Sequence, residues 1–122
     1  MAGTETLRAI LDDLHAACPA LQASFIVSQD GFTMAAIGTV TEADGERAGA
    51  LSAGLLTLCR NMMTELRRGE LEQVLLRSGE GYLLLQLAGP AAMIAAMTGV
   101  ETNLGMLLIE IERAARLVAR SI

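Results

Sequence analysis

The sequence predicts an α/β/α sandwich whose elements follow the order α-β-β-α-β-β-β-α. Three long segments carry apolar residues at helical spacing, and five short apolar runs bounded by glycine-containing turns lie between them. Run 82–88 is apolar on both faces, so a sheet that contains it needs cover on both sides. A chain of 122 residues fits one domain, which we place at residues 4–121.

The first three elements are a short helix and a hairpin. Residues 4–17 show the amphipathic helical spacing i, i+3, i+4, i+7, with Leu7, Ile10, Leu11 and Leu14. Pro19 stops this helix, because the residue before a proline is disfavoured in the helical region. Runs 23–28 and 32–37 flank Asp30-Gly31, which predicts a hairpin. His15, the single histidine of the chain, is expected on the polar, solvated side of the helix.

A long helix is expected at residues 42–68. Thr41 or Asp44 would supply its N-cap, and Gly69 would close it in a left-handed conformation. One apolar stripe should pack on the sheet: Ala48, Leu51, Leu55, Leu58, Met62 and Leu66, widened by Leu56, Cys59 and Met63. The opposite side carries small uncharged residues where a surface helix has charges: Ala50, Ala53, Gly54, Thr57, Asn61 and Thr64. We therefore predict that this side pairs with the same helix of a second copy.

The C-terminal half predicts a β-meander followed by a helix. Strands are expected at 70–78, 82–88 and 91–98, because glycine-containing turns separate these runs and such short connections make antiparallel neighbours. The last helix should begin near Thr102, with one apolar stripe facing the sheet.

Composition excludes several classes of function. The net charge is −5 with no lysine, which disfavours nucleic-acid binding. No apolar run is long enough to span a membrane, so we expect no direct membrane insertion and a cytoplasmic location. Cys18 and Cys59 have no disulfide or metal-ligand spacing and are expected to be reduced thiols. The 52% apolar content with 2% aromatic residues favours an oligomer.

Nothing in the sequence predicts catalysis. The chain lacks phosphate-loop motifs. Its one histidine is the single candidate for a histidine metal site or a Ser-His-Asp triad, and no neighbouring residues in the sequence support either. We expect no enzyme, no catalytic residue, no cofactor and no metal. Arg47, Arg60, Arg67 and Arg68 lie on or near the long helix and are candidates for binding a partner, although cations at a helix C-terminus also simply complement its dipole.

Five segments in this order and spacing resemble the roadblock/dynein light chain family, particularly its bacterial members. They are VSQDGF (27–32), ALSAGLL (50–56), LEQVLL (71–76), GYLL (81–84) and NLG (103–105). The resemblance implies a profilin-like, five-stranded antiparallel sheet between helices. It also implies a homodimer in which the central helices pair and the sheets join through the third strand. Leu71, Gln73 and Leu75 of that strand would then join the small residues of the helix in the interface.

The resemblance also implies a function. Bacterial relatives commonly work with small Ras-like GTPases, in cell polarity or in signalling clusters with a sensor kinase, whereas eukaryotic relatives are dynein subunits or scaffolds. The leading expectation is a homodimeric regulator that binds such a GTPase and modulates its nucleotide state. The alternatives are a passive scaffold or adaptor indifferent to that state, and a small-molecule sensor, which would need an apolar pocket with a few polar groups. A heterodimer with a paralogue stays open.

Overall fold

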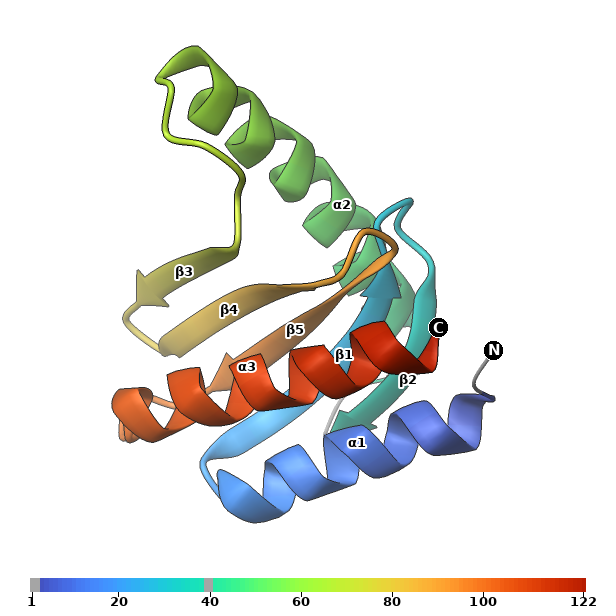
Figure 1. The fold of residues 1–122 in the computed structure, drawn as a ribbon. Coiled ribbons are helices and arrows are strands. Elements are labelled where there is room, and N and C mark those ends of the chain that lie inside the picture. The colour runs from blue at the N-terminus through green and yellow to red at the C-terminus, as the bar shows by residue number, and fades with distance from the viewer. Residues whose placement is uncertain (1–2, 39–40) are drawn as a thin grey trace.

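The computed structural model describes residues 3–38 and 41–122 and shows a sheet covered unequally on its two faces. All strands are antiparallel to their neighbours, in the spatial order β2-β1-β5-β4-β3. Two helices, α1 and α3, cover one face, and α2 alone lies on the other (Figure 1). The elements are α1 (Thr4–Ala17), β1 (Leu21–Ser28), β2 (Thr33–Gly38), α2 (Glu42–Glu65), β3 (Gln73–Ser78), β4 (Gly81–Ala88), β5 (Ala92–Thr98) and α3 (Leu104–Ser121). The predicted order and layers are confirmed.

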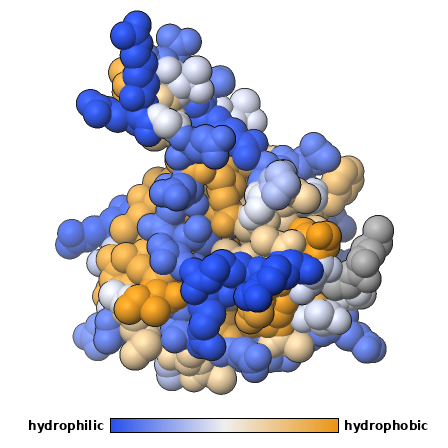
Figure 2. Space-filling model, in the orientation of Figure 1, coloured by the Kyte–Doolittle hydropathy of each residue, from blue (hydrophilic) through white to orange (hydrophobic). Residues whose placement is uncertain are grey.

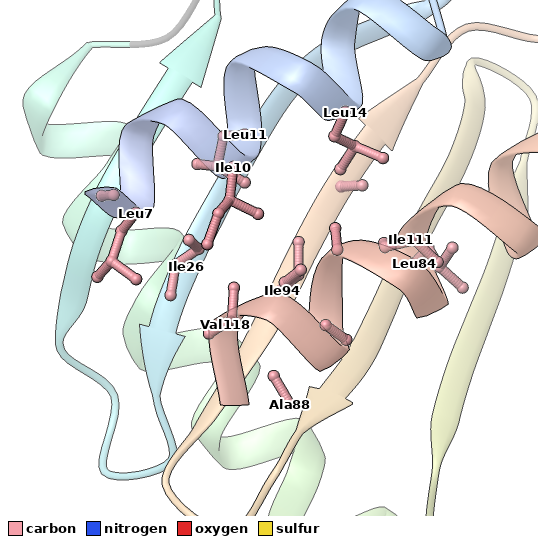
Figure 3. Close-up of a cluster of buried hydrophobic side chains, with 14 of the residues drawn as sticks. Leu7, Ile10, Leu11, Leu14, Ile26, Leu84, Ala88, Ile94, Ile111 and Val118 are labelled. Atoms are coloured by element: carbon pink, nitrogen blue, oxygen red, sulfur yellow. The ribbon is translucent and has the colours of Figure 1, made fainter. Parts of the chain in front are cut away.

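The α1/α3 side holds the larger core. Leu11 of α1 and Ile111 of α3 are fully buried, and they share one cluster with Ile26 and Ile94 of the sheet (Figure 3). Leu7, Ile10, Leu11 and Leu14 are the buried residues of α1, as their spacing predicts. Burying side chains of this size contributes about 1.5–3 kcal/mol each, so this layer dominates the stability of the fold.

Helix α2 touches the sheet through small residues. Its buried positions are Gly45, Gly49, Ser52 and Leu56. A Cβ added at Gly49 would lie 2.7 Å from the carbonyl oxygen of Gly31, in the β1–β2 turn. The hydroxyl of Thr33 donates a hydrogen bond to the Gly45 carbonyl over 2.8 Å. The glycines therefore let the first half of α2 approach the β1–β2 hairpin at backbone distance.

The prediction that the leucine stripe of α2 packs on the sheet is wrong for most of its large residues, although Leu56 is buried in the core and Ala48 and Leu55 pack against it. Leu51, Leu58 and Met62 are 67, 65 and 55% exposed, and Leu66, just beyond the helix, is 60% exposed. This stripe lies about 100° around the helix axis from the buried row. Close contact of the first half of α2 with the hairpin leaves no room for a leucine at Gly49, so small residues face the sheet there and the stripe is turned to one side.

The ends of α2 follow two different rules. Thr41 is the N-cap and forms a reciprocal capping box with Asp44, so the first of the predicted caps is confirmed. The predicted C-terminus is wrong: the helix ends at Glu65, and Arg67, with φ of 56°, closes it. Gly69 is left-handed as predicted, with φ of 85°, but it lies beyond the closure. The Arg68 N–H donates to the Met63 carbonyl and the Arg67 N–H to the Thr64 carbonyl, which is a Schellman closure.

His15 is not a solvated surface residue as predicted. Its Nε2 lies 2.8 Å from the hydroxyl oxygen of Ser24, which is fully buried in β1 beneath α1. Partial burial lowers the pKa of His15 below its ordinary value of 6.5, and the nearby Asp12 carboxylate opposes this only in part. The neutral imidazole therefore links α1 to the sheet.

Acidification should weaken the fold through His15. Because its pKa is lower in the folded chain, the unfolded chain takes up the proton first as the pH falls below 6.5. The contribution of His15 is complete above pH 6.5 and is lost as the pH falls through the folded pKa. We expect the urea midpoint to fall between about pH 7.5 and about pH 5.5 by more in the wild type than in His15→Gln. Equal decreases in the two proteins would contradict this role.

Candidate functional site

The face of the sheet that carries α2 is only half covered, and an apolar groove fills the uncovered part. Helix α2 contacts β1 and β2, while β3, β4 and β5 extend beyond it (Figure 1). The groove has a volume of about 420 Å³. Its lining is apolar apart from Ser52: Phe25, Ala48, Leu51, Leu55, Val74, Leu76, Leu83, Leu84, Leu85, Ala95, Ala96 and Met97. Leu76 and Leu83 pair across β3 and β4 and are 43 and 47% exposed.

The leucine stripe of α2 continues this groove toward the end of the helix. We call Leu51, Leu55, Leu58 and Met62 the apolar flank; Leu51 and Leu55 line the groove, and Leu58 and Met62 extend the surface beyond it. Scattered single apolar residues are normal on protein surfaces, but a contiguous apolar patch marks an interaction site. The apolar flank and the groove together are therefore the candidate functional site, and their chemistry fits a protein partner.

The groove ends at a free sheet edge. Among the residues that the structure describes, β3 pairs with β4 alone, so its other side presents unpaired backbone groups. Of the three predicted interface residues here, Leu75 is 41% exposed, while Leu71 and Gln73 are half-buried. Gln73 donates a side-chain hydrogen bond of 2.7 Å to Gln86 on β4. The predicted joining of two sheets through this strand stays a prediction, for which the open edge leaves room.

The small-residue side of α2 points away from the groove, and toward the end of the helix Thr64 lines a separate cavity with residues of β4. Ala50, Gly54, Thr57, Asn61 and Thr64 are exposed, whereas Ala53 is half-buried. Ala53 lies against the β1–β2 turn: a Cβ added at Gly31 would be 3.3 Å from its Cβ. The Thr57 hydroxyl donates to the Ala53 carbonyl within the helix, and none of the six side chains is charged. The predicted role of this side as a dimer seam stays a prediction.

The four candidate arginines do not share one environment. Arg47 forms an exposed salt bridge of 3.1 Å with Asp44, one helical turn away. Arg67 and Arg68 form the closure that follows α2. Arg60 alone reaches another element, where it donates a hydrogen bond of 2.7 Å to the side-chain oxygen of Gln29. Arg60 is therefore the arginine whose position the fold fixes.

Gln29 is a positioning residue that sequence reasoning missed. Its amide nitrogen donates to the carbonyls of Gly89 and Ala92, at 3.0 and 3.2 Å, while its amide oxygen accepts from Arg60. It thus ties the second half of α2 to the β4–β5 turn. A glutamine beside a predicted turn gave no signal for this role, because its partners lie 31 to 63 residues away in sequence.

The described part of the chain holds no cluster suited to catalysis or metal binding. Residues 3–38 and 41–122 contain no group of three or more histidine, cysteine or carboxylate side chains that could hold a metal ion. The His15–Ser24 pair has the residue types of a base and a nucleophile, but Ser24 is 0% exposed and no substrate reaches it. Burial and the nearby Glu110 raise the pKa of the Cys18 thiol, which keeps it protonated. None of the helices described is long and apolar enough to cross a membrane.

Comparison with known proteins gives a family match across most of the chain. The family model described as Roadblock/LC7 domain matches residues 9–98. Two Methanocaldococcus jannaschii proteins, MJ0310 and MJ1340, are each 29% identical to this chain over 97 residues. Each of these matches covers 78% of this chain and 82% of the relative.

Solved structures share the fold at low sequence identity. A Roadblock/LC7 domain from Streptomyces avermitilis superposes with a TM-score of 0.86 at 21% identity, covering 92% of this chain and 93% of the other. MglB from Myxococcus xanthus gives 0.88 at 16% identity, with 96 and 87% covered. Profilin II from Acanthamoeba castellanii gives 0.57 at 16% identity, with 84 and 87% covered. The fold is therefore roadblock- and profilin-like.

Proposed function

Because this chain belongs to the Roadblock/LC7 domain family, we propose that it is a non-enzymatic homodimeric regulator that binds a small Ras-like GTPase and biases its nucleotide state. The observation that carries the proposal is the apolar flank of α2 with the groove beside it, a surface that one chain leaves uncovered. The family resemblance supports the kind of partner, since bacterial members commonly work with such GTPases. The structural likeness to MglB, a gliding protein in Thermus thermophilus, supports the same choice.

In the proposed homodimer the second copy lies on the groove side of α2. There the groove, the apolar flank and the free edge of β3 are contiguous, so one partner can cover all three. Joining two β3 edges would continue the sheet and remove an edge that invites aggregation. In this arrangement the two α2 helices meet at the leucines around Leu58, and not at the small residues around Thr57 as the sequence predicts. Burial of leucine side chains contributes more free energy to association.

The small-residue side of α2 is then left for the GTPase. In a dimer joined through the groove, this uncharged surface remains accessible on both copies, with Arg60 at its border. Small side chains let a partner approach the helix backbone closely, and Gln29 holds the guanidinium of Arg60 in place before binding. Regulation requires that the complex form with different affinities in the two nucleotide states.

Calorimetric titration tests this proposal. The protein is titrated into the Ras-like GTPase encoded nearest its gene, loaded either with GDP or with a non-hydrolysable GTP analogue. We expect about 10-fold tighter binding to one form, equivalent to about 1.4 kcal/mol. Thr57→Glu should weaken that binding, because it places a charge on the proposed contact surface without touching the core. Equal affinities would favour the passive scaffold, and absence of binding would remove this GTPase as the partner.

A further inference from the structure

A cavity separate from the groove lies beneath the end of α2. Its volume is about 650 Å³, and none of the described residues lines both this cavity and the groove. Its walls are the second half of α2, the linker 69–72, the end of β4 and the β4–β5 turn. In Figure 2 the end of α2 projects from the body of the molecule, and hydrophobic surface shows at the foot of this projection. We call this space the α2 cavity.

The α2 cavity follows from the path of the helix. The buried residues of α2 end at Leu56, and the second half of the helix extends away from the sheet (Figure 1). The chain then returns through the linker and begins β3 at Gln73. The hydrogen bond from Arg60 to Gln29 joins this half of the helix to the end of β1. The space is therefore set by the course of the backbone and not by a missing side chain.

The helix wall of the α2 cavity carries a positive charge in a fixed position. The Arg60 guanidinium donates to the Gln29 side-chain oxygen over 2.7 Å, and Gln29 itself donates to two backbone carbonyls. This bond uses one of the five N–H donors of an arginine. Within residues 3–38 and 41–122, Arg60 forms no salt bridge. A carboxylate that enters the cavity can therefore be bound in the bidentate manner that arginine favours.

The linker wall of the α2 cavity carries negative charge. Glu70 and Glu72 are exposed there, and no salt bridge of the described chain includes either carboxylate. Leu71 and Leu87, both half-buried, add apolar surface to the lining. The cavity thus fits an occupant that has an acidic group, a basic group and some apolar surface.

We infer that a loop of the GTPase enters the α2 cavity, with an acidic side chain on Arg60 and a basic side chain on Glu70 or Glu72. The inference rests on the proposed function. Thr64 belongs both to the wall of the cavity and to the small-residue side of α2, so the cavity adjoins the surface proposed for the GTPase. One partner can therefore cover the small residues and fill the cavity. Two opposite charges at separate walls fix the register of this contact and select against loops with other charges.

Other occupants fit the α2 cavity less well. Small-molecule sites usually bury most of the ligand, whereas Arg60, Glu70 and Glu72 are all exposed to solvent. Nucleic acids and anionic membranes are repelled by the two carboxylates. A loop of a protein that is already bound along α2 meets neither obstacle, because the larger contact holds the loop in place.

Charge reversal on the linker tests the inference, because Glu70 and Glu72 lie outside the small-residue side of α2. The test variant of the full chain carries Glu70→Arg and Glu72→Arg. Its control carries Glu80→Arg and Glu101→Arg, which lie at exposed positions outside the cavity and change the net charge equally. Both are titrated calorimetrically into the Ras-like GTPase encoded nearest the gene, in the nucleotide form that the wild type prefers. We expect about 10-fold weaker binding for the test variant and a change below about 2-fold for the control.

Reversing the charge of the helix wall gives a second, independent test. Arg60→Glu should also weaken the complex by about 10-fold, whereas Arg8→Glu, at an exposed position of α1, should leave the affinity unchanged. All four variants should keep the circular dichroism spectrum and the light-scattering mass of the wild type.

Two results would overturn the inference while the proposed function stands. One is a wild type that binds the GTPase together with cavity variants that bind it as tightly as their controls do. The other is a lower mass for the linker variant than for its control, which would assign the linker to the contact between two copies. A wild type that binds neither nucleotide form would refute the proposed function for this GTPase, and the inference with it. The failures of the two proposals are therefore distinguishable.

Discussion

Replacing Leu58 with Glu is expected to convert the protein into a folded monomer. Leu58 is 65% exposed in the single chain, so a charged side chain there stays solvated and costs the fold little. In the proposed dimer the same position lies between two copies of α2, where each carboxylate would lose its water without gaining a cation. A penalty of about 3 kcal/mol weakens association by about 100-fold. Light scattering at micromolar concentration should give one chain mass, 12.8 kDa.

Val100→Glu is the matched control for this variant. Val100 is 61% exposed in the loop before α3, away from the groove and the apolar flank, so the same charge should leave the mass unchanged. Far-ultraviolet circular dichroism should be the same for both variants and the wild type. A Leu58→Glu protein with the mass of the wild type would place the contact between copies elsewhere.

Replacing Gly81 with Ala is expected to destabilise the fold strongly. Gly81 begins β4 with φ of 136°, a region that side-chain-bearing residues rarely adopt. A Cβ there would lie 1.9 Å from the carbonyl oxygen of Thr98 on β5. The Cβ is fixed to the backbone of β4 and the oxygen belongs to the backbone of β5, so neither can move without opening the sheet. Backbone strain and this overlap together should cost about 4 kcal/mol, a large part of the usual stability of a domain.

Gly79→Ala in the same β3–β4 turn is the control. A Cβ added at Gly79 meets no atom within 4 Å, so the free energy of unfolding of this variant should lie within about 1 kcal/mol of the wild-type value. Urea denaturation followed by circular dichroism measures both. Similar urea midpoints for the two variants would contradict this prediction, because they would show that β4 and β5 can move apart at Gly81 at little cost in free energy.

The sequence predicted well those features that depend on local chemistry. The Asp30-Gly31 turn, the cap at Thr41 and the spacing of leucines in α1 each act over a few residues, and all three are present. The family resemblance is confirmed by the match to the Roadblock/LC7 domain and by the fold. Local signals therefore sufficed for the order of elements and for the layers.

Features that depend on distant contacts were not predictable. Apolar periodicity shows that a helix has a contact face but does not say which protein covers it. In α2 the leucines around Leu58 face outward, while Gly49 and Ser52 touch the sheet because the hairpin approaches so closely. Arg67 takes the left-handed position that glycine usually fills, and the backbone hydrogen bonds of the closure accompany this conformation. The sequence predicted the α2 helix of the candidate site but not the groove. The groove forms only where Leu76 of β3 and Leu83 of β4 lie on a sheet face that α2 leaves open, and this depends on the tertiary fold.

Disulfide scanning along β3 tests most directly the central claim that two copies join through this strand and α2. Single cysteines are introduced at positions 73 to 77 in a Cys59→Ser background, and each variant is oxidised mildly. When two β3 strands pair about a two-fold axis, one residue lies opposite the same residue of the other copy. Its two Cα atoms are then separated by about 4.4–6.8 Å, the distance that a disulfide requires. The account predicts rapid crosslinking at that position and slow crosslinking at its neighbours. Slow, uniform crosslinking along the whole strand would contradict it.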